Sequence, residues 1–180
     1  MALYAVESFG ASDTVGGFAS SAFVLGATCM RVFSGWIVDR VGHKKAALAS
    51  LAFVTLVAVA YFFAHNVAVL IIVRMVHGAA YALTSTALMA VAQSVIPHER
   101  RAEGTGYFAL GTTLATAFGP AIGLLLANNI GYTTLFAVAL GANIVSLILA
   151  LVLRYPAEVS SEKPAFSLRN AGHPNVVPIG

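Results

Sequence analysis

Long apolar segments alternate with short polar ones along most of the chain. A helix needs roughly 20 residues to cross a hydrocarbon core of about 30 Å. Segments of about that length or longer run over residues 17–38, 46–63, 67–96, 105–127 and 133–153. The one at 67–96 is long and requires tilt or an overhang. The pattern therefore predicts five transmembrane helices.

Composition argues against a water-soluble helical bundle. Of the 180 residues 59% are hydrophobic and 9% are charged, whereas soluble domains have about a quarter charged residues. The stretches 51–63 and 135–153 lack the polar face that a soluble helix needs. The formal net charge of +3 is not gathered on one face, so no nucleic-acid partner is expected. We expect an all-α fold: a polytopic helical membrane protein in a lipid bilayer.

The basic residues of the loops predict an orientation. They follow the first, third and fifth predicted spans: Arg40, Lys44, Lys45, Arg100, Arg101, Arg154, Lys163 and Arg169. The loops at 64–66 and 128–132 contain neither lysine nor arginine. Because positive loops stay in the cytoplasm, we expect the N-terminus outside and the C-terminus inside, in a bacterial inner (plasma) membrane.

This topology divides the chain into three parts. Residues 1–16 are expected to be an extracytoplasmic segment, 17–154 the helical bundle, and 155–180 a polar cytoplasmic linker with at most a short surface helix at 165–170.

A cluster of charges interrupts the apolar pattern in G-W-I-V-D-R-V-G-H-K-K, at residues 35–45. Anchoring at lipid headgroups explains the basic residues, and a tight turn explains one glycine, but neither explains the spacing of the whole set. The set is Gly35, Asp39, Arg40, Gly42, Lys44 and Lys45. Its spacing resembles the loop signature of the major facilitator superfamily, glycine-x-x-x-aspartate-arginine-x-glycine-x-lysine/arginine-lysine/arginine. In that family the loop joins helices two and three on the cytoplasmic side.

Further motifs follow in the family's order. R-M-V-H-G at 74–78 resembles the arginine-x-x-x-glycine of helix four, and 97–106 resembles the link between helices four and five. The helix-five motif of antiporter members is matched at Gly106, Gly119, Pro120 and Gly123, with Ala115 and Leu124 replacing two of its glycines. That departure affects the antiporter assignment more than the family. The resemblance covers roughly residues 3–170.

The resemblance implies a function and a register. The five spans correspond to helices two to six of an N-terminal six-helix bundle, with the last turn of helix one in residues 1–6. The chain is then a fragment whose missing partners are helix one and the C-terminal half. We expect a secondary transporter, not an enzyme and without cofactors, that moves a small-molecule substrate by alternating access, with the proton as coupling ion and efflux as the favoured direction. The alternative is a non-transporting membrane subunit or a half-size partner of a transporter.

The resemblance also implies roles for single residues. Asp39 and Arg40 would close a cytoplasmic gate, with Glu99 or Glu103 as their candidate partner within this chain. The arginine of the helix-four motif would act in proton coupling.

Arg74 has a physical interpretation of its own. It lies 7 residues into the span that begins at Val67, hence about 10 Å below the boundary. A charge at that depth indicates a functional cavity or partner; the alternative is a side chain that extends to the headgroups. His77 and Tyr81 share its helical face, with Gly78 beside them. His77 either titrates near neutral pH or forms a hydrogen bond between helices.

Two other features remain open between structure and function. Arg31 lies in the cytoplasmic half of its span, and a cavity role and an interfacial role are equally compatible with that position. A ridge of small residues allows close helix packing, and a proline within it favours a bend. The ridge consists of Gly111, Ala115, Gly119, Gly123 and Ala127. No metal-ligand pattern and no catalytic base beside a nucleophile occurs in the sequence.

Overall fold

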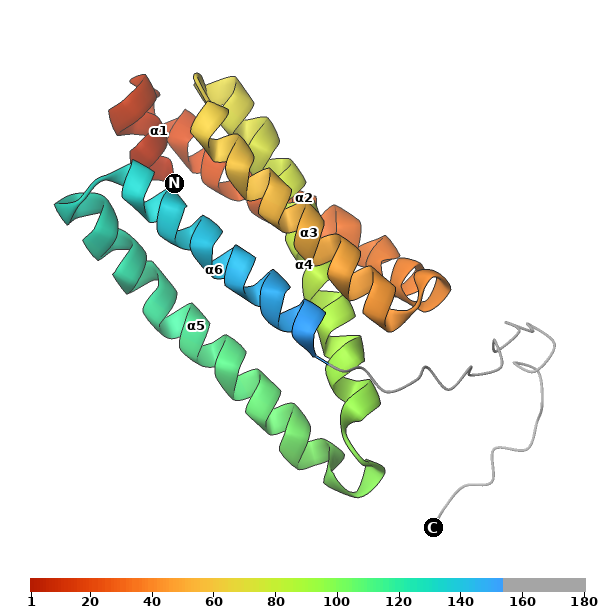
Figure 1. The fold of residues 1–180 in the computed structure, drawn as a ribbon. Coiled ribbons are helices and arrows are strands. Elements are labelled where there is room, and N and C mark those ends of the chain that lie inside the picture. Colours follow the sequence, from red (N-terminus) through yellow and green to blue (C-terminus); the bar gives the residue numbers. More distant parts are fainter. Residues whose placement is uncertain (154–180) are drawn as a thin grey trace, which may run out of the picture.

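The computed structural model describes residues 1–153, which are helical throughout apart from short connections (Figure 1). The elements are α1 (Ala2–Phe9), α2 (Asp13–Val41), α3 (His43–Ala60), the 3-10 turn η1 (Tyr61–Phe63), α4 (Val67–Val95), the 3-10 turn η2 (His98–Arg100), α5 (Arg101–Asn129) and α6 (Tyr132–Val152). Five of these helices are long and apolar enough to cross a membrane. The all-α fold with five spans is therefore confirmed. The surface helix expected at 165–170 lies outside the described residues.

The helix ends are set by capping residues. α2 begins at Asp13, four residues before the predicted start, because the Ser12 side chain accepts a hydrogen bond from the Val15 amide at 3.4 Å. Gly10 ends α1 with a left-handed backbone at φ 62°. Gly42 alone separates α2 from α3 and has φ 93°. This positive φ explains why the tight turn between the two spans uses glycine.

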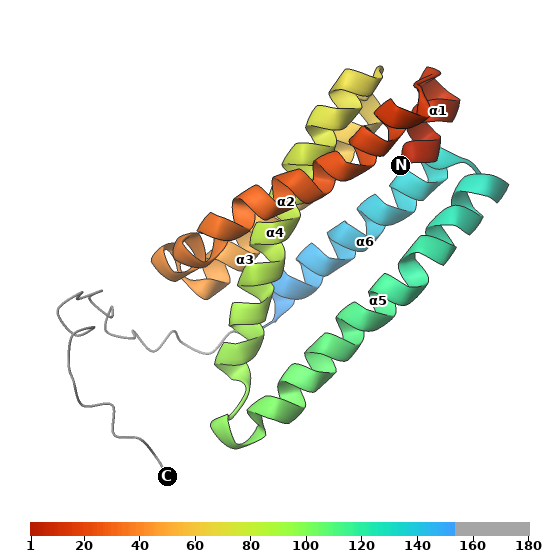
Figure 2. The same ribbon diagram turned by 180° about the vertical axis from the view of Figure 1, so that it is seen from behind.

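The helices run antiparallel between two ends of the bundle. One end holds the Gly42 turn, the connection at 96–100 and the last turn of α6, and the other holds the connections at 64–66 and 130–131 (Figures 1 and 2). The basic residues of the first two connections therefore gather at one end.

The closest packing joins α2 to α4 at two glycines. A Cβ atom added at Gly26 would overlap the carbonyl oxygen of Met75, and one added at Gly78 would overlap that of Phe23. The two backbones are thus in direct contact: Gly26 of α2 lies against Met75 of α4, and Gly78 of α4 lies against Phe23 of α2. Such contacts are the usual way for helices to associate in lipid, where apolar side chains gain little by leaving the hydrocarbon.

Side chains add to the contact between α2 and α4 and join other helices to it. Within the pair, Ser34 of α2 and Thr86 of α4 share a hydrogen bond of 3.0 Å. At the opposite end of the bundle, aromatic rings of α1, η1 and α6 pack together, and the Tyr132 hydroxyl donates to Glu7 at 2.7 Å. α6 is thereby held against α1 and α3 at the end where α1 lies.

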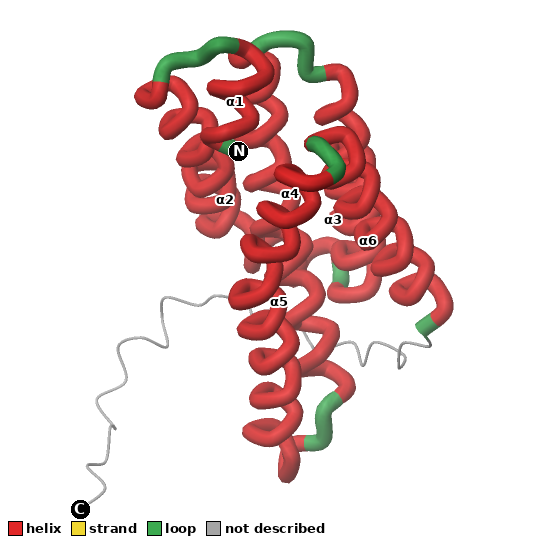
Figure 3. The backbone as a smooth tube through the Cα atoms, turned by 90° about the vertical axis from the view of Figure 1, so that its left-hand side faces the viewer, coloured by secondary structure: helices red, strands yellow, loops and turns green. Residues whose placement is uncertain are grey.

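α5 stands apart from α2 and α3, meets α4 only near the connection between them, and runs beside α6 (Figures 1 and 3). None of its residues is buried within the described chain. The Thr105 hydroxyl accepts a bond from the Gln93 amide of α4 at 2.7 Å, while Thr112 and Thr116 donate to carbonyls of α5 itself. Its polar side chains are therefore satisfied mainly within the helix.

The predicted ridge of small residues on α5 contacts almost nothing in this part of the chain. Cβ atoms added at Gly106, Gly111 or Gly119 would meet no atom within 4 Å, and one at Gly123 would meet only Leu135, at 3.8 Å. Pro120 lies inside the helix. Packing on this ridge stays a prediction about surfaces that residues 1–153 do not supply.

The glycine contact between α2 and α4 predicts a selective loss of stability. Gly26→Ala places a methyl group on the Met75 carbonyl and is expected to cost about 1–3 kcal/mol, because the helices must separate. Gly17→Ala, on the same helix, meets no atom within 4 Å. It is expected to be neutral or stabilising by up to about 1 kcal/mol, since alanine favours helix. Thermal unfolding of both variants in detergent measures the difference. Equal midpoints would contradict the close approach.

Candidate functional site

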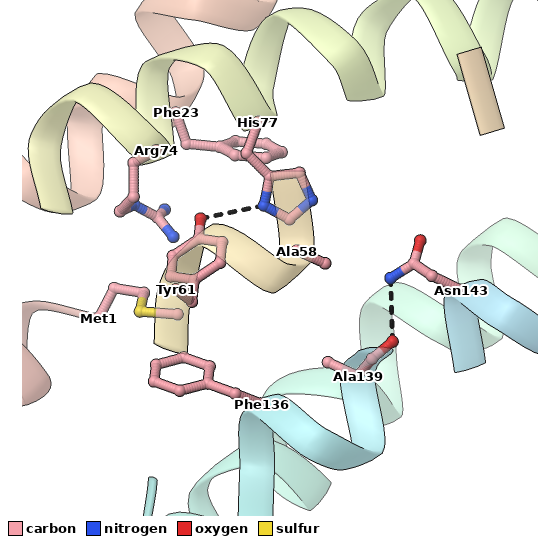
Figure 4. Close-up of a pocket in the computed structure, with 9 residues that line it drawn as sticks. All are labelled: Met1, Phe23, Ala58, Tyr61, Arg74, His77, Phe136, Ala139 and Asn143. Carbon is pink, nitrogen blue, oxygen red and sulfur yellow. Dashed lines mark hydrogen bonds between the residues drawn. The ribbon is translucent and has the colours of Figure 1, made fainter. Parts of the chain in front are cut away.

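A cavity of about 230 Å³ lies between α2, α3 with η1, α4 and α6 (Figure 4). Its lining combines three aromatic rings, one guanidinium, one imidazole and one side-chain amide with two alanines and Met1. The lining residues are Met1, Phe23, Ala58, Tyr61, Arg74, His77, Phe136, Ala139 and Asn143. Two residues that the sequence singled out, on one face of α4, thus meet partners from three other elements.

Arg74 reaches from α4 across to α2. Its Nε donates to the Ala19 carbonyl at 2.8 Å and its Nη2 to the Ser20 carbonyl at 3.2 Å. The guanidinium carbon lies 5.3 Å from the centre of the Phe23 ring, within the range of a cation–π contact. No carboxylate within residues 1–153 forms an ion pair with Arg74. Partial charges alone, from carbonyl dipoles and a ring face, therefore compensate this guanidinium in the described chain.

Tyr61 joins the site through the turn η1. α3 ends at Ala60 and tightens into a 3-10 turn, and the Tyr61 hydroxyl oxygen lies 2.9 Å from Nδ1 of His77. The His77 ring makes edge contacts with the rings of Phe23 and Tyr61, at 5.6 and 5.4 Å between centres. One interpretation of His77, a hydrogen bond between helices, is thus present in the structure.

Sequence reasoning missed Tyr61, although its side chain is almost fully buried at the cavity wall. The only signal was its place in Y-F-F at the end of a span. Aromatic residues there are usually interfacial, so the pattern favoured an interfacial position.

The other polar or motif residues on or near this face of α4 do not line the cavity. Tyr81 packs beside Phe23, 5.5 Å between ring centres, and does not line the cavity. Gly78 serves the contact with α2 described above. Thr84 is buried and donates to the Ala80 carbonyl at 2.8 Å. Of the three residues Arg74, His77 and Tyr81 that share one face of α4, only the first two therefore line the cavity.

The predicted gate residues are not brought together. Asp39 and Arg40 are exposed at the end of α2, where the Arg40 guanidinium lies 5.5 Å from the centre of the Trp36 ring. Glu103 instead accepts two bonds of 2.9 Å from Arg100, three residues away. Glu103 pairs with Arg100 because residues three apart are already neighbours, so this ion pair needs no approach of distant helices.

Several other predicted residues stand outside the cavity. Glu99 and Arg31 are exposed, and a Cβ at Gly35 would meet no atom within 4 Å. Lys44 and Lys45 are exposed in the first turn of α3. Among the described residues, no group of three or more histidine, cysteine, aspartate or glutamate side chains could hold a metal ion.

Known proteins resemble this chain over most of its length. The family model of the Major Facilitator Superfamily matches residues 1–178. An uncharacterized protein of Mycobacterium tuberculosis is 35% identical over 124 residues, which are 68% of this chain and 29% of that protein. The staphylopine export protein of Staphylococcus aureus is 31% identical over 136 residues, 74% of this chain and 33% of the relative.

A more distant relative is the tetracenomycin C resistance and export protein of Streptomyces glaucescens, 22% identical over 149 residues, 83% of this chain and 28% of the relative. The chain spans about a third of the length of these curated relatives. Together with five apolar helices of spanning length, the family match makes this an integral membrane protein. The chain belongs to the Major Facilitator Superfamily of transporters.

Proposed function

We propose that this chain forms part of a secondary transporter that exports a small molecule by alternating access, driven by protons. The observation that supports this most is the cavity between α2, α3, α4 and α6, with an arginine about 10 Å inside its span. The exporter names of two relatives favour efflux. In such carriers, two halves rock about a site near the middle of the membrane.

The charge distribution supports the orientation. The end of the bundle that holds the Gly42 turn and the connection at 96–100 has Arg40, Lys45 and Arg101 exposed. The connections at the other end contain no lysine or arginine. By the positive-inside rule, the basic end faces the cytoplasm and α1 lies outside.

The length of the relatives supports a function shared with helices outside this chain. The unburied α5 and its ridge at 111–123 offer a surface for such helices. Asp39 and Arg40, also exposed, are proposed to close the cytoplasmic gate against groups outside residues 1–153. Glu103 is less suited to that role than the sequence suggested, because Arg100 already holds it.

The first prediction concerns sufficiency. Inverted vesicles that contain only these 180 residues are expected to show no substrate-dependent proton movement, because alternating access requires two halves that rock against each other. Vesicles with a complete carrier that includes this sequence are expected to respond. A pH-sensitive dye measures the response to tetracenomycin C, staphylopine and ethidium. A response from the chain alone would contradict the shared function, and silence from the complete carrier would favour a non-transporting subunit.

The second prediction concerns Arg74. In the complete carrier, Arg74→Ala is expected to reduce proton-coupled flux to background, because it removes the guanidinium of the cavity and its bonds to α2. Arg31→Ala, which removes an exposed arginine outside the cavity, serves as the matched control and should retain flux. Surface expression of both variants is measured alongside. Unchanged flux in Arg74→Ala would assign this side chain to anchoring.

A further inference from the structure

The cavity has more hydrogen-bond donors than its own groups use. Of the nine lining residues none has an acidic side chain, and Arg74 is the only one with a permanently charged side chain. A guanidinium has five N–H groups, and the two bonds to α2 occupy two of them. Figure 4 shows its terminal nitrogens turned toward the Tyr61 hydroxyl. An anion in the cavity would meet a positive charge with which no carboxylate of residues 1–153 forms an ion pair.

The pair of Tyr61 and His77 adds one more donor whichever way its proton lies. If the tyrosine hydroxyl donates to Nδ1 of the imidazole, the neutral ring has its proton on Nε2 and can donate there. If Nδ1 has the proton instead, the hydroxyl hydrogen is released to point elsewhere. In the second arrangement the O–H can donate to a ligand beside Arg74, whereas in the first the Nε2–H lies on the side of the imidazole away from Arg74 (Figure 4).

The rest of the wall suits an apolar, flat body. Phe136 stacks on Tyr61 with 5.3 Å between ring centres and 24° between planes, and Phe23 covers another side. Asn143 donates one N–H to the Ala139 carbonyl at 2.9 Å, which leaves its second N–H and its oxygen for a ligand. The volume of about 230 Å³ is below the range of about 300–1,000 Å³ for drug-sized ligands, so one ring is the fitting size.

We propose that this cavity binds a small aromatic carboxylate as the carrier's substrate class. The carboxylate would pair with Arg74 and accept from the Tyr61–His77 pair, and the ring would lie between Phe23 and Phe136. A cation would find no carboxylate among the nine lining residues. The assignment of this ligand as substrate rests on the proposed transport function.

Fluorine NMR of the full chain in nanodiscs of zwitterionic lipid tests the proposal. The probe is 4-fluorobenzoate, and 4-fluorobenzamide is its neutral match in size and shape. Broadening of the benzoate signal, reversed by unlabelled benzoate and absent with empty nanodiscs, is the expected result. The benzamide should bind at least tenfold more weakly, because it cannot form charge-assisted bonds.

Matched variants locate the binding. Arg74→Gln keeps hydrogen-bonding groups but loses the charge, and it should weaken benzoate binding at least tenfold. Arg31→Gln makes the same change on an exposed residue outside the cavity and should leave binding unchanged. Tyr61→Phe keeps the ring but loses the hydroxyl, and it should weaken binding several-fold. If Arg74→Gln does not fold, as judged by thermal unfolding, Tyr61→Phe decides.

Three results would overturn the proposal: no benzoate binding, equal binding of the benzamide, or binding that neither cavity variant weakens. Failure here is distinct from failure of the transport function. A complete carrier that moves only neutral or cationic compounds, with no benzoate binding, would remove this inference alone. Benzoate binding that depends on Arg74, with no transport of any compound, would retain the site and remove its role in transport.

Discussion

The contact between the backbones of α2 and α4 determines where almost every other group in the bundle lies. Helices usually pack with axes about 8–10 Å apart, and side chains at Gly26 or Gly78 would force a wider separation. With glycine at both positions, the Arg74 guanidinium is close enough to donate to α2 carbonyls, and the Phe23 ring meets the His77 ring. The cavity is therefore a consequence of two missing methyl groups.

The other walls of the cavity depend indirectly on the contact between α2 and α4. α3 follows α2 after Gly42 and packs along α4, and its last residues tighten into η1. That turn orients Tyr61 toward α4, where its hydroxyl meets His77. Phe136 of α6 then closes the space against the Tyr61 ring. Each step uses a group that the previous one has positioned, from a backbone contact to a polar pair inside the membrane.

The sequence predicted those features that depend on a single helix or a single turn. Hydropathy located all five spans, and the need for a tight turn identified Gly42. Helical spacing placed Arg74 and His77 on one face. The sequence did not identify Tyr61 as a site residue, because its contact with His77, 16 positions along the chain, requires the packing of α3 on α4. The position of a single residue in the sequence contains no information about that packing.

Gly78 and Glu103 show the same limit in different ways. The motif placed Gly78 beside the residues expected to act in proton coupling, whereas in the structure Gly78 packs against the backbone of α2 at Phe23. Nothing in the sequence pattern indicated that Gly26 of α2 makes the reciprocal contact. Glu103 was expected to be a partner of the gate residues Asp39 and Arg40, but Arg100 lies three residues away and forms an ion pair with it. Register between helices and competition from near neighbours both arise only in three dimensions.

The threonines of α5 have a consequence for how the protein is made. Because Thr112, Thr113 and Thr116 each donate to a carbonyl of their own helix, these three threonines in the middle of α5 present no hydroxyl hydrogen that needs a partner in hydrocarbon. A helix of this kind can leave the translocation machinery and remain in the bilayer alone. It has no need to wait for a neighbour, so its docking can be the last event of assembly, well after α2 and α4 have met.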